Sequence, residues 1–413
     1  MANIIWNTAV DLDEKVRLMR EDARFEVADD ASGVPELADI RSSVRAKKAP
    51  PTVPKVFLSN DCIFNCAYCG CRSGRDCARR YQSTPRELAE LAVSEARRAN
   101  RGIFLTSAII RTPDYTQELM IETMKIIRGE LNFQGYVHSK VMPGTAPELI
   151  HTAGLYADRL SVNIEVARSE GYKQIAKNKN KTNILGPMGS ISRQIEAARA
   201  EASRFAPPFA TSQTTQMMAG SSGEDDYTIL RLSGALYRKY HLSRVYYTAF
   251  HYQDPAAGYE ELPPMATPLW RVRRLYQADR LMQLYGFAAE EIVPEATPAL
   301  QEDLDPKVAW ALRNLHLFPV EVNRAGYEML LRVPGIGVTY AKRIVKARQY
   351  CALSHDSLQA LGVSLKRARH FIVCKGKYQG ETCENPMRLH SILREGEDTT
   401  QTELTGTQTL RVC

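Results

Sequence analysis

Short apolar runs alternate with longer amphipathic stretches along the chain from about residue 52 onward. The apolar runs are rich in β-branched and aromatic residues, as buried strands are. Between them, apolar residues recur every three or four positions, which is the spacing of one helix face. The predicted strands are Lys55–Leu58, Gly102–Leu105, Gly135–His138, Asp158–Ile164, Ala210–Met217 and Arg244–Phe250. The predicted helices are Thr84–Ala99, Gln117–Arg128, Ile191–Arg204, Asp226–Tyr240 and Leu269–Tyr285.

The order of these elements predicts the architecture. The first helix has a clear beginning, because Thr84 suits the N-cap, Pro85 suits the first helical position and Glu87 completes a capping box. Six strand–helix units in series predict a parallel sheet with helices outside it. Because such connections are right-handed, we expect the sheet to curl into a full or partial barrel. Ligand-binding residues of these folds lie in the loops that follow the strands.

The pattern changes at four points and divides the chain into five parts. These are a charged N-terminal extension (1–50), the barrel (51–290), a linker with Pro and acidic residues (291–322), a module of short helices (323–376) and a flexible tail (377–413). The tail is too poor in apolar residues to support a core. The predicted fold class is therefore α/β, a partial (β/α)6 barrel followed by a small all-α domain.

Composition narrows the class of protein only slightly. Apolar residues make up 44% of the 413 positions and charged residues 24%, which is ordinary for a soluble globular protein. The 54 basic residues exceed the 47 acidic ones, and the net charge of +7 permits a polyanionic partner without requiring one. We expect a cytoplasmic protein without a membrane span, because the sequence has neither a long apolar run nor a signal-peptide pattern.

Five of the nine cysteines lie between Cys62 and Cys77. In an intracellular chain, clustered cysteines bind metal more often than they form disulfides. Cys62, Cys66 and Cys69 have the spacing C-x3-C-x2-C directly after the first strand. Three thiolates can hold three irons of a [4Fe-4S] cluster, which takes four cysteines when the protein ligates it fully. The fourth iron would then be open to a small molecule.

The other cysteines leave alternatives open. A zinc site needs four ligands, and only Cys71 or Cys77 could complete one beside the three-cysteine loop. The later cysteines contain no C-x2-C pair, so we expect them to bind no metal; they are Cys351, Cys374 and Cys383.

The cysteine spacing, with Tyr68 just before the third cysteine, and the six strand–helix units resemble the radical S-adenosylmethionine (SAM) superfamily. The resemblance implies a [4Fe-4S] cluster and SAM as cofactors, and a reducing partner of the flavodoxin or ferredoxin type. It implies that SAM binds the open iron and is cleaved to a 5′-deoxyadenosyl radical, which abstracts hydrogen from a substrate. Cys71 is then either an ordinary thiol beside the reactive loop or a hydrogen donor to a substrate radical.

The resemblance also implies where SAM binds. After the second strand, superfamily members carry a Gly-Gly-Glu stretch that receives the SAM amino group, and this sequence has Thr106 and Ser107 there. Their hydroxyls can accept the same hydrogens. Alternation along the fourth strand puts Ser161, Asn163 and Glu165 on one face. In related enzymes this face contacts the SAM ribose and carboxylate.

A looser match concerns the adenine of SAM. Gln216 and Gly220 follow the fifth strand where the superfamily has a G-x-I-x-G-x-x-E pattern, and the resemblance implies that they contact the adenine. The end of the sixth strand is rich in aromatic residues, which form either core packing or a stacking surface for a nucleobase; they are Tyr246, Tyr247, Phe250, His251 and Tyr252.

Two basic segments flank these loops. Arg72 to Arg80 holds four arginines, and Lys173 to Lys181 holds four lysines, among them Lys179. Each segment is interpreted as a solvated loop or, with a nucleic-acid partner, as a phosphate contact.

The module at 323–376 contains Val333-Pro334-Gly335-Ile336-Gly337 between two amphipathic helices, which resembles the helix-hairpin-helix of DNA-binding proteins. Gly335 and Gly337 permit a tight turn, and the amides that begin the second helix can face a phosphate. Positive charge beside the turn comes from Lys342, Arg343 and Lys346. A weaker copy follows at 357–369. The expected partner is duplex DNA, bound through its backbone without sequence reading; a purely structural helical pair is the alternative.

Together these features resemble the radical SAM proteins assigned to DNA modification or repair, over about residues 50–375. The likeness includes the stretches Tyr136–Ala153 and Trp310–Pro319. It implies an enzyme that acts on a flipped or unpaired base, and a partner protein resembling a uracil-DNA glycosylase. Two other functions remain open: a radical SAM enzyme that modifies RNA or a nucleotide, and a non-catalytic iron–sulfur sensor that binds DNA.

Overall fold

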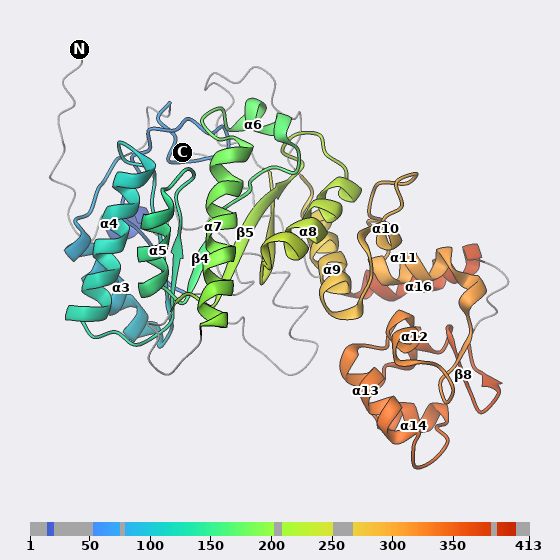
Figure 1. The fold of residues 1–413 in the computed structure, drawn as a ribbon. Helices are drawn as coiled ribbons and strands as arrows, with labels where there is room; N and C mark the ends of the chain where they lie inside the picture. The colour runs from blue at the N-terminus through green and yellow to red at the C-terminus, as the bar shows by residue number, and fades with distance from the viewer. Residues whose placement is uncertain are drawn as a thin grey trace. The chain divides into compact units, whose positions relative to one another are not determined.

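The structure, a computed structural model, describes residues 15–19, 53–74, 79–201, 209–250, 267–380 and 386–401. The chain forms two compact units, Met1–Glu224 with Ala235–Arg273, and Asp225–Gly234 with Arg274–Cys413 (Figure 1). The boundary therefore differs from the predicted one at residue 290. Of the predicted extension 1–50, only residues 15–19 are described, and they are helical.

The first unit is built on a six-stranded sheet in the order β1-β2-β3-β4-β5-β6, in which all neighbours are parallel. Its strands are β1 (Lys55–Phe57), β2 (Ile103–Thr106), β3 (Val137–Lys140), β4 (Arg159–Ser161), β5 (Ser212–Ala219) and β6 (Arg244–Ala249). This confirms the predicted α/β class and all six predicted strands. β4 is shorter than predicted, because regular pairing ends at Ser161. Beyond it, Glu165 has a left-handed conformation (φ +65°) and forms a single bridge to Met217 of β5.

Helices connect the strands, and Figure 1 shows α4, α5 and α7 side by side over the sheet. The helices up to the end of β6 are α3 (Pro85–Ala99), α4 (Pro113–Lys125), the π-helical η3 (Ile126–Glu130), α5 (Pro147–Tyr156), α6 (Ser169–Ile175), α7 (Lys181–Ala200) and α8 (Asp226–Tyr240). After it, α9 spans Leu269–Tyr285. The capping box at Thr84 and Glu87 is present as predicted. α7 begins ten residues before the predicted helix at Ile191. The prediction began too late because Pro187, which lies inside α7, normally breaks a helix.

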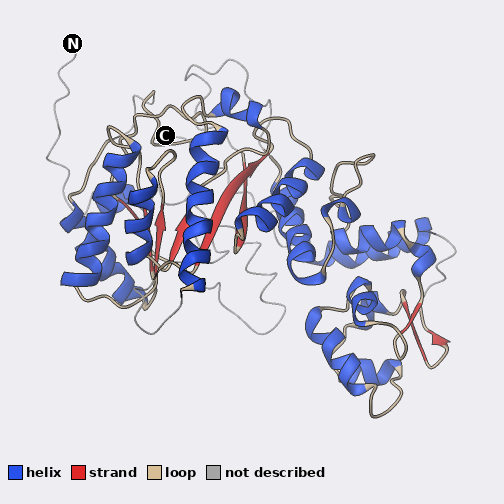
Figure 2. Cartoon of the chain, in the orientation of Figure 1, coloured by secondary structure: helices blue, strands red, loops and turns tan. Residues whose placement is uncertain are grey.

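The second unit combines short helices with a small sheet (Figure 2). Its elements after α9 are α10 (Ala289–Ile292), α11 (Pro306–Arg313), the 3-10 helix η4 (Leu315–Leu317), β7 (Val320–Glu321), α12 (Tyr327–Arg332), α13 (Val338–Ala347), α14 (His355–Ala360), α15 (Leu365–Ala368), β8 (Ile372–Cys374), β9 (Lys377–Tyr378) and α16 (Pro386–Gln401). The strands pair in the order β7-β8-β9. The all-α prediction for this region was therefore wrong, because strands of two or three residues are too short to show a period.

The predicted linker and tail also contain regular structure. Trp310, on α11, is buried and packs edge-on against Phe287 and Phe318, and Phe318 packs in turn against Phe371. Within the predicted tail, β9 and α16 are formed, and Leu389 and Leu393 of α16 are buried. None of the described helices combines the length and the apolar character needed to cross a bilayer.

Candidate functional site

The three-cysteine loop follows β1 and is attached to the loops after two other strands. Its Ile63 amide donates to the Ile109 carbonyl (2.9 Å) in the loop after β2. Farther along, the Ala67 amide donates to the Ile175 carbonyl (2.8 Å) at the end of α6, and the Asn65 amide donates to Oδ1 of Asn178 (3.0 Å). The loop is therefore fixed at the carboxyl ends of the parallel strands, where this fold class places its ligands.

Cys62, Cys66 and Cys69 form no disulfide, with Cys66 buried and the other two half-buried. Sγ of Cys62 accepts hydrogen bonds from the Phe64 and Ile109 amides, both at 3.4 Å. Burial raises the pKa of the Cys62 thiol, and the nearby charge of Cys69 raises it further. Burial likewise raises the pKa of Cys66 to about 12, against the opposing charge of Lys179. The thiols therefore lie close enough to affect one another's ionisation.

These thiols fit an iron–sulfur cluster better than a single ion. Among the described residues, no three Cys, His, Asp or Glu side chains are arranged as ligands of one metal ion. A cluster has a different requirement, since each thiolate binds a separate iron. The site also holds a buried cation, Arg72, whose Nε and Nη2 have no hydrogen-bond partner. Three thiols and a buried guanidinium suit an anionic group in this loop.

A buried ion pair lies directly behind the loop. Nζ of Lys179 contacts Oε1 of Glu165 at 2.7 Å and the Tyr68 hydroxyl at 3.0 Å. The side chains of Glu165 and Lys179 are only 5% and 12% exposed. Burial alone would raise the pKa of Glu165, but the Lys179 ammonium, helped by Lys140, lowers it below its ordinary value. Glu165 is therefore a carboxylate at neutral pH.

The segment Lys173–Lys181 was interpreted as a solvated loop or a phosphate contact, and Lys179 fits neither description. Lys173, Lys177 and Lys181 are exposed, but Lys179 turns inward to pair with Glu165. Nothing in the local sequence distinguishes it from the other three lysines. The partner that draws it inward comes from the turn after β4, and only the fold brings the two together.

Three of the predicted SAM-binding residues lie on one face of the sheet. The other face is marked by Gln213, which points toward α7 because its Nε2 donates to the Met188 carbonyl (3.2 Å). By strand register and alternation, Thr106, Ser161 and Gln216 lie on the opposite face. Glu165 reaches the site by the turn after β4 and not by strand alternation, since β4 ends at Ser161.

The remaining predicted contacts are placed as follows. Ser107 donates to the Ala108 carbonyl (2.6 Å), and Asn163 is half-buried beyond β4. Gly220 has φ +80°, and a Cβ there would lie 1.9 Å from Oγ1 of Thr267, so only glycine fits. Cys71 is buried, and its role as an ordinary thiol or a hydrogen donor stays open. Cys77 lies outside the described residues.

Sequence reasoning missed two polar residues of β3. His138 is buried and lies 2.8 Å from the Ser161 hydroxyl, measured from Nε2. Lys140 lies two residues farther along, on the same face, and its charge acts on Glu165. Their spacing of two residues was a usable signal, but the predicted strand stopped at His138.

The aromatic residues at the end of β6 are buried. Tyr246, Tyr247 and Phe250 are at most 3% exposed. This supports core packing and leaves no stacking surface on these three side chains. Two other aromatic candidates of this region, His251 and Tyr252, lie outside the described residues.

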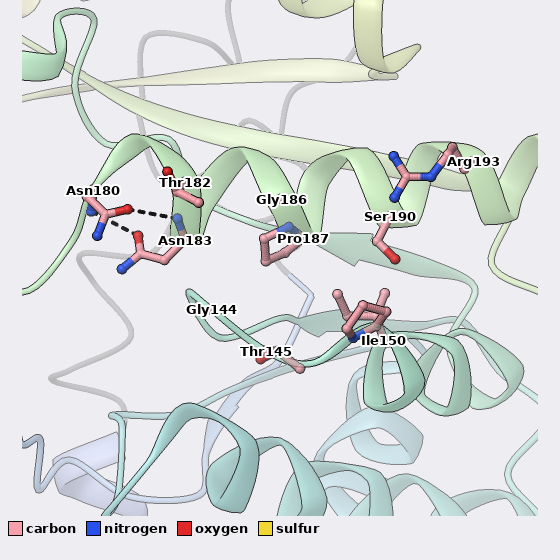
Figure 3. A pocket seen from close by; sticks show the side chains of 11 residues that line it. Gly144, Thr145, Ile150, Asn180, Thr182, Asn183, Gly186, Pro187, Ser190 and Arg193 are labelled. Atoms are coloured by element: carbon pink, nitrogen blue, oxygen red, sulfur yellow. Dashed lines mark hydrogen bonds between the residues drawn. The ribbon is translucent and has the colours of Figure 1, made fainter.

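A pocket of about 500 Å³ opens between α7 on one side and the loop after β3 with the start of α5 on the other (Figure 3). Asn180 and Asn183 form a capping box at the start of α7, with both hydrogen bonds at 2.9 Å. The Gly144 amide donates to the Asn183 carbonyl (2.7 Å). These polar groups are therefore used within the fold, and Arg193 is the charged side chain that lines the pocket.

In the second unit, two helix–turn–helix pairs pack against each other. The α12–α13 turn has Gly335 at φ +84°, and the α14–α15 turn has Gly362 at φ +89°. A Cβ on Gly335 would lie 3.1 Å from the Ala368 amide nitrogen, and one on Gly362 would lie 3.2 Å from the Tyr340 ring. Each turn thus abuts the second helix of the other pair, and both positions require glycine.

The basic residues of this module divide into two groups. Lys342 and Lys346 are exposed on α13. Arg343 instead donates to the Leu361 carbonyl (3.0 Å) at the end of α14 and lies over the Tyr340 ring, so it holds the two pairs together. Gly337 is the N-cap of α13 with an ordinary negative φ, and it has no need of the glycine-only region.

Below the first turn, Lys307 is buried and donates from Nζ to the Ile336 carbonyl (2.6 Å). Burial lowers the pKa of Lys307 from 10.5 to about 7.

Between pH 7 and pH 10.5, the unfolded chain binds a proton at Lys307 that the folded chain does not, so the free energy of unfolding should rise with pH. We expect a slope of at most about 1.4 kcal/mol per pH unit, measured by chemical denaturation at several pH values. Lys307→Met should remove the slope, the exposed-site control Lys377→Met should keep it, and equal slopes in both variants would contradict the prediction.

No protein-family model and no curated protein matches the chain. Among solved structures, it is similar to the FeFe-hydrogenase maturase HydG from Carboxydothermus hydrogenoformans, with 17% identity and a TM-score of 0.43 over 56% of this chain and 51% of that one. It is also similar to methylornithine synthase (PylB), with 14% identity and a TM-score of 0.44 over 65% of this chain and 72% of that one.

A third similar structure is the radical S-adenosylmethionine methyltransferase TsrM from Kitasatospora setae, with cobalamin and a [4Fe-4S] cluster bound. The identity is 11% and the TM-score 0.33, over 48% of this chain and 36% of that one. The chain thus spans about half the length of HydG and about a third of TsrM. Likenesses this distant leave the function to be argued from the chain's own residues.

Proposed function

We propose that this chain is a radical SAM enzyme that acts on nucleic acid, in DNA modification or repair, with a [4Fe-4S] cluster held by Cys62, Cys66 and Cys69. The observation that carries the proposal is the position of three cysteines, none of them in a disulfide, on one loop at the carboxyl ends of a six-stranded parallel sheet. When bound, the cluster and SAM supply a 5′-deoxyadenosyl radical that takes hydrogen from a substrate.

The polar face of the sheet suits the charged and hydroxyl groups of SAM. Oγ1 of Thr106 is fully buried and has no hydrogen-bond partner among the described residues, so it is an acceptor available to the SAM amino group, beside Ser107. The carboxylate of Glu165 accepts hydrogens from ribose hydroxyls, with Ser161 and Asn163 nearby along the chain. The adenine contacts in this proposal are Gln216 and Gly220.

The paired helix–turn–helix module supports a nucleic-acid substrate. Lys342 and Lys346 are exposed on α13, Lys346 in its last turn, and exposed lysines can neutralise backbone phosphates of a duplex. Such contacts hold a duplex without reading its sequence. In this proposal the module supplies affinity for DNA and the first unit supplies the chemistry. A flavodoxin- or ferredoxin-type reductant and a protein resembling a uracil-DNA glycosylase are the proposed protein partners.

The proposal predicts SAM cleavage that depends on DNA. The protein is reconstituted anaerobically, reduced and given SAM, and 5′-deoxyadenosine is measured without nucleic acid, with duplex DNA and with tRNA. A rise with duplex DNA supports the proposal. A rise with tRNA alone moves the substrate to RNA, and a full cluster with no product under any condition supports the non-catalytic sensor.

The Lys342→Glu/Lys346→Glu variant tests the module itself. We expect duplex binding to weaken by about tenfold or more, and the slope of log affinity against log salt to fall by about 0.9 for each lost phosphate contact. Binding is measured by fluorescence anisotropy over a salt series. Lys125→Glu/Lys239→Glu makes the same charge change at exposed positions of α4 and α8; equal weakening in both variants would show a general charge effect and remove the module from the proposal.

A further inference from the structure

Arg72 is the most buried charged residue beside the three-cysteine loop, although it begins a segment that is rich in arginine. Only 1% of its surface is exposed, so neither a solvated loop nor a phosphate contact describes it. Its amide donates to the Cys69 carbonyl (3.3 Å), and its Nη1 donates to the Ala67 carbonyl (3.4 Å). The side chain therefore turns back into the loop that carries the three thiols.

The backbone around Arg72 is held by a second arginine. Nη1 of Arg80 donates to the carbonyls of Asn60 (2.6 Å) and Cys71 (2.9 Å), and its Nη2 donates to the carbonyl of Arg72 itself (2.5 Å). The Arg72 side chain is thus presented from a fixed backbone. Its buried position is built into the loop.

The guanidinium of Arg72 lacks the partners that burial demands. Nε and Nη2 have no hydrogen-bond partner, and no described carboxylate forms an ion pair with it. A guanidinium is always charged in proteins, and a buried charge is unfavourable unless it is paired and hydrogen-bonded. Two buried donors of Arg72 are therefore available to an anionic group that binds within the loop.

We infer that the Arg72 guanidinium donates hydrogen bonds to the sulfur atoms of the iron–sulfur cluster and raises the cluster's reduction potential. The inference rests on the proposed cluster at Cys62, Cys66 and Cys69. A cluster with three thiolate ligands is anionic, and it becomes more negative by one charge on reduction. Hydrogen bonds to the sulfurs and nearby charge set the potential of such clusters. A fixed cation stabilises the reduced form more than the oxidised form, so Arg72 is a positioning and tuning residue.

The first test is a redox titration of the reconstituted full chain, followed by the electron paramagnetic resonance of the reduced cluster. We expect Arg72→Met to lower the ratio of reduced to oxidised cluster at a fixed solution potential by about tenfold, which is about 59 mV for one electron. Arg72→Lys keeps the charge but loses the forked donors, so a smaller shift is expected. Arg101→Met, an equal charge change at an exposed position before β2, should leave the potential unchanged.

The second test needs no cluster. Without an anionic partner, a buried unpaired charge lowers the free energy of unfolding, and its removal takes this cost away. Cluster-free Arg72→Met should therefore be at least as resistant to denaturant as the cluster-free wild type. With the cluster bound, the order should reverse. This comparison decides the matter if Arg72→Met loads too little cluster for titration, because a cluster-free variant less stable than wild type would make Arg72 a structural residue.

These outcomes separate the inference from the proposed function. If the wild type assembles no [4Fe-4S] cluster, the proposed function fails. If the wild type assembles the cluster and Arg72→Met titrates at the wild-type potential, the function stands and the assignment of Arg72 is overturned.

Discussion

Cys66→Ala should assemble no [4Fe-4S] cluster and form no 5′-deoxyadenosine. Three thiolates already leave one iron of the cluster without a protein ligand, and we expect two thiolates to be too few to retain the cluster. The loss should far exceed the roughly 10- to 100-fold effect of changing an outer contact. Cys62→Ala and Cys69→Ala should behave identically. Iron and sulfide content, the paramagnetic resonance of the reduced protein and chromatographic measurement of 5′-deoxyadenosine check the result.

Two further cysteine variants act as controls. Cys351→Ala changes an exposed thiol in the second unit and should keep both cluster and activity. Cys71→Ala should keep the cluster, and it separates two interpretations: an ordinary thiol leaves product formation intact, whereas a hydrogen donor allows SAM cleavage but stops release of the final product. A Cys66→Ala protein that still forms 5′-deoxyadenosine would overturn the cluster assignment.

The sheet could be predicted from sequence because its signals are local. Each strand is an apolar run with a turn on either side, and the capping box of Thr84 and Glu87 marks the start of the first long helix. The prediction failed where local signals conflict with the fold. Pro187 lies inside α7, where packing of buried neighbours such as Ile184 and Ile191 outweighs the lost backbone hydrogen bond.

Only the part of the candidate site that lies on one continuous loop could be predicted from the sequence. Three cysteines at fixed spacing predict a cluster site from one short segment alone. The roles of Arg72 and Lys179 were not predictable, because each lies in a basic segment in which the local pattern does not single it out. What distinguishes them is burial and, for Lys179, a partner 14 residues away across a turn. Those properties arise from tertiary packing and leave no mark on the local pattern.

The same distinction holds in the second unit. Gly335 was recognisable because a positive φ demands glycine, and the turn has φ +84° there. Arg343 stays a predicted DNA contact, and it also donates to the Leu361 carbonyl at the end of α14, a partner 18 residues away that the local sequence does not indicate. Sequence therefore predicts the positions that the backbone dictates, but not the tertiary partners of basic side chains.

The buried pair of Glu165 and Lys179 should make a large contribution to the stability of the first unit. Glu165→Gln leaves an uncompensated ammonium behind the cluster loop, and Lys179→Met leaves an uncompensated carboxylate. Each should cost about 3–5 kcal/mol of unfolding free energy, whereas the double variant should recover most of the loss. Equilibrium denaturation of the four proteins gives the coupling energy directly. Glu90→Gln, in an exposed pair with Arg86, should cost only about 0–1 kcal/mol.

The pH dependence of this pair has a definite sign. Burial raises the pKa of Glu165 and Lys179 lowers it, with a net decrease from its ordinary value. The carboxylate therefore stabilises the fold above its unfolded-state pKa, and this contribution is lost as pH falls through the folded-state value. The stability difference between wild type and Glu165→Gln should accordingly shrink on acidification. A difference that is constant with pH, or a double variant no more stable than either single one, would mean that the two charges do not stabilise each other. Tyr68 would then be fixed beside the cysteines by packing alone.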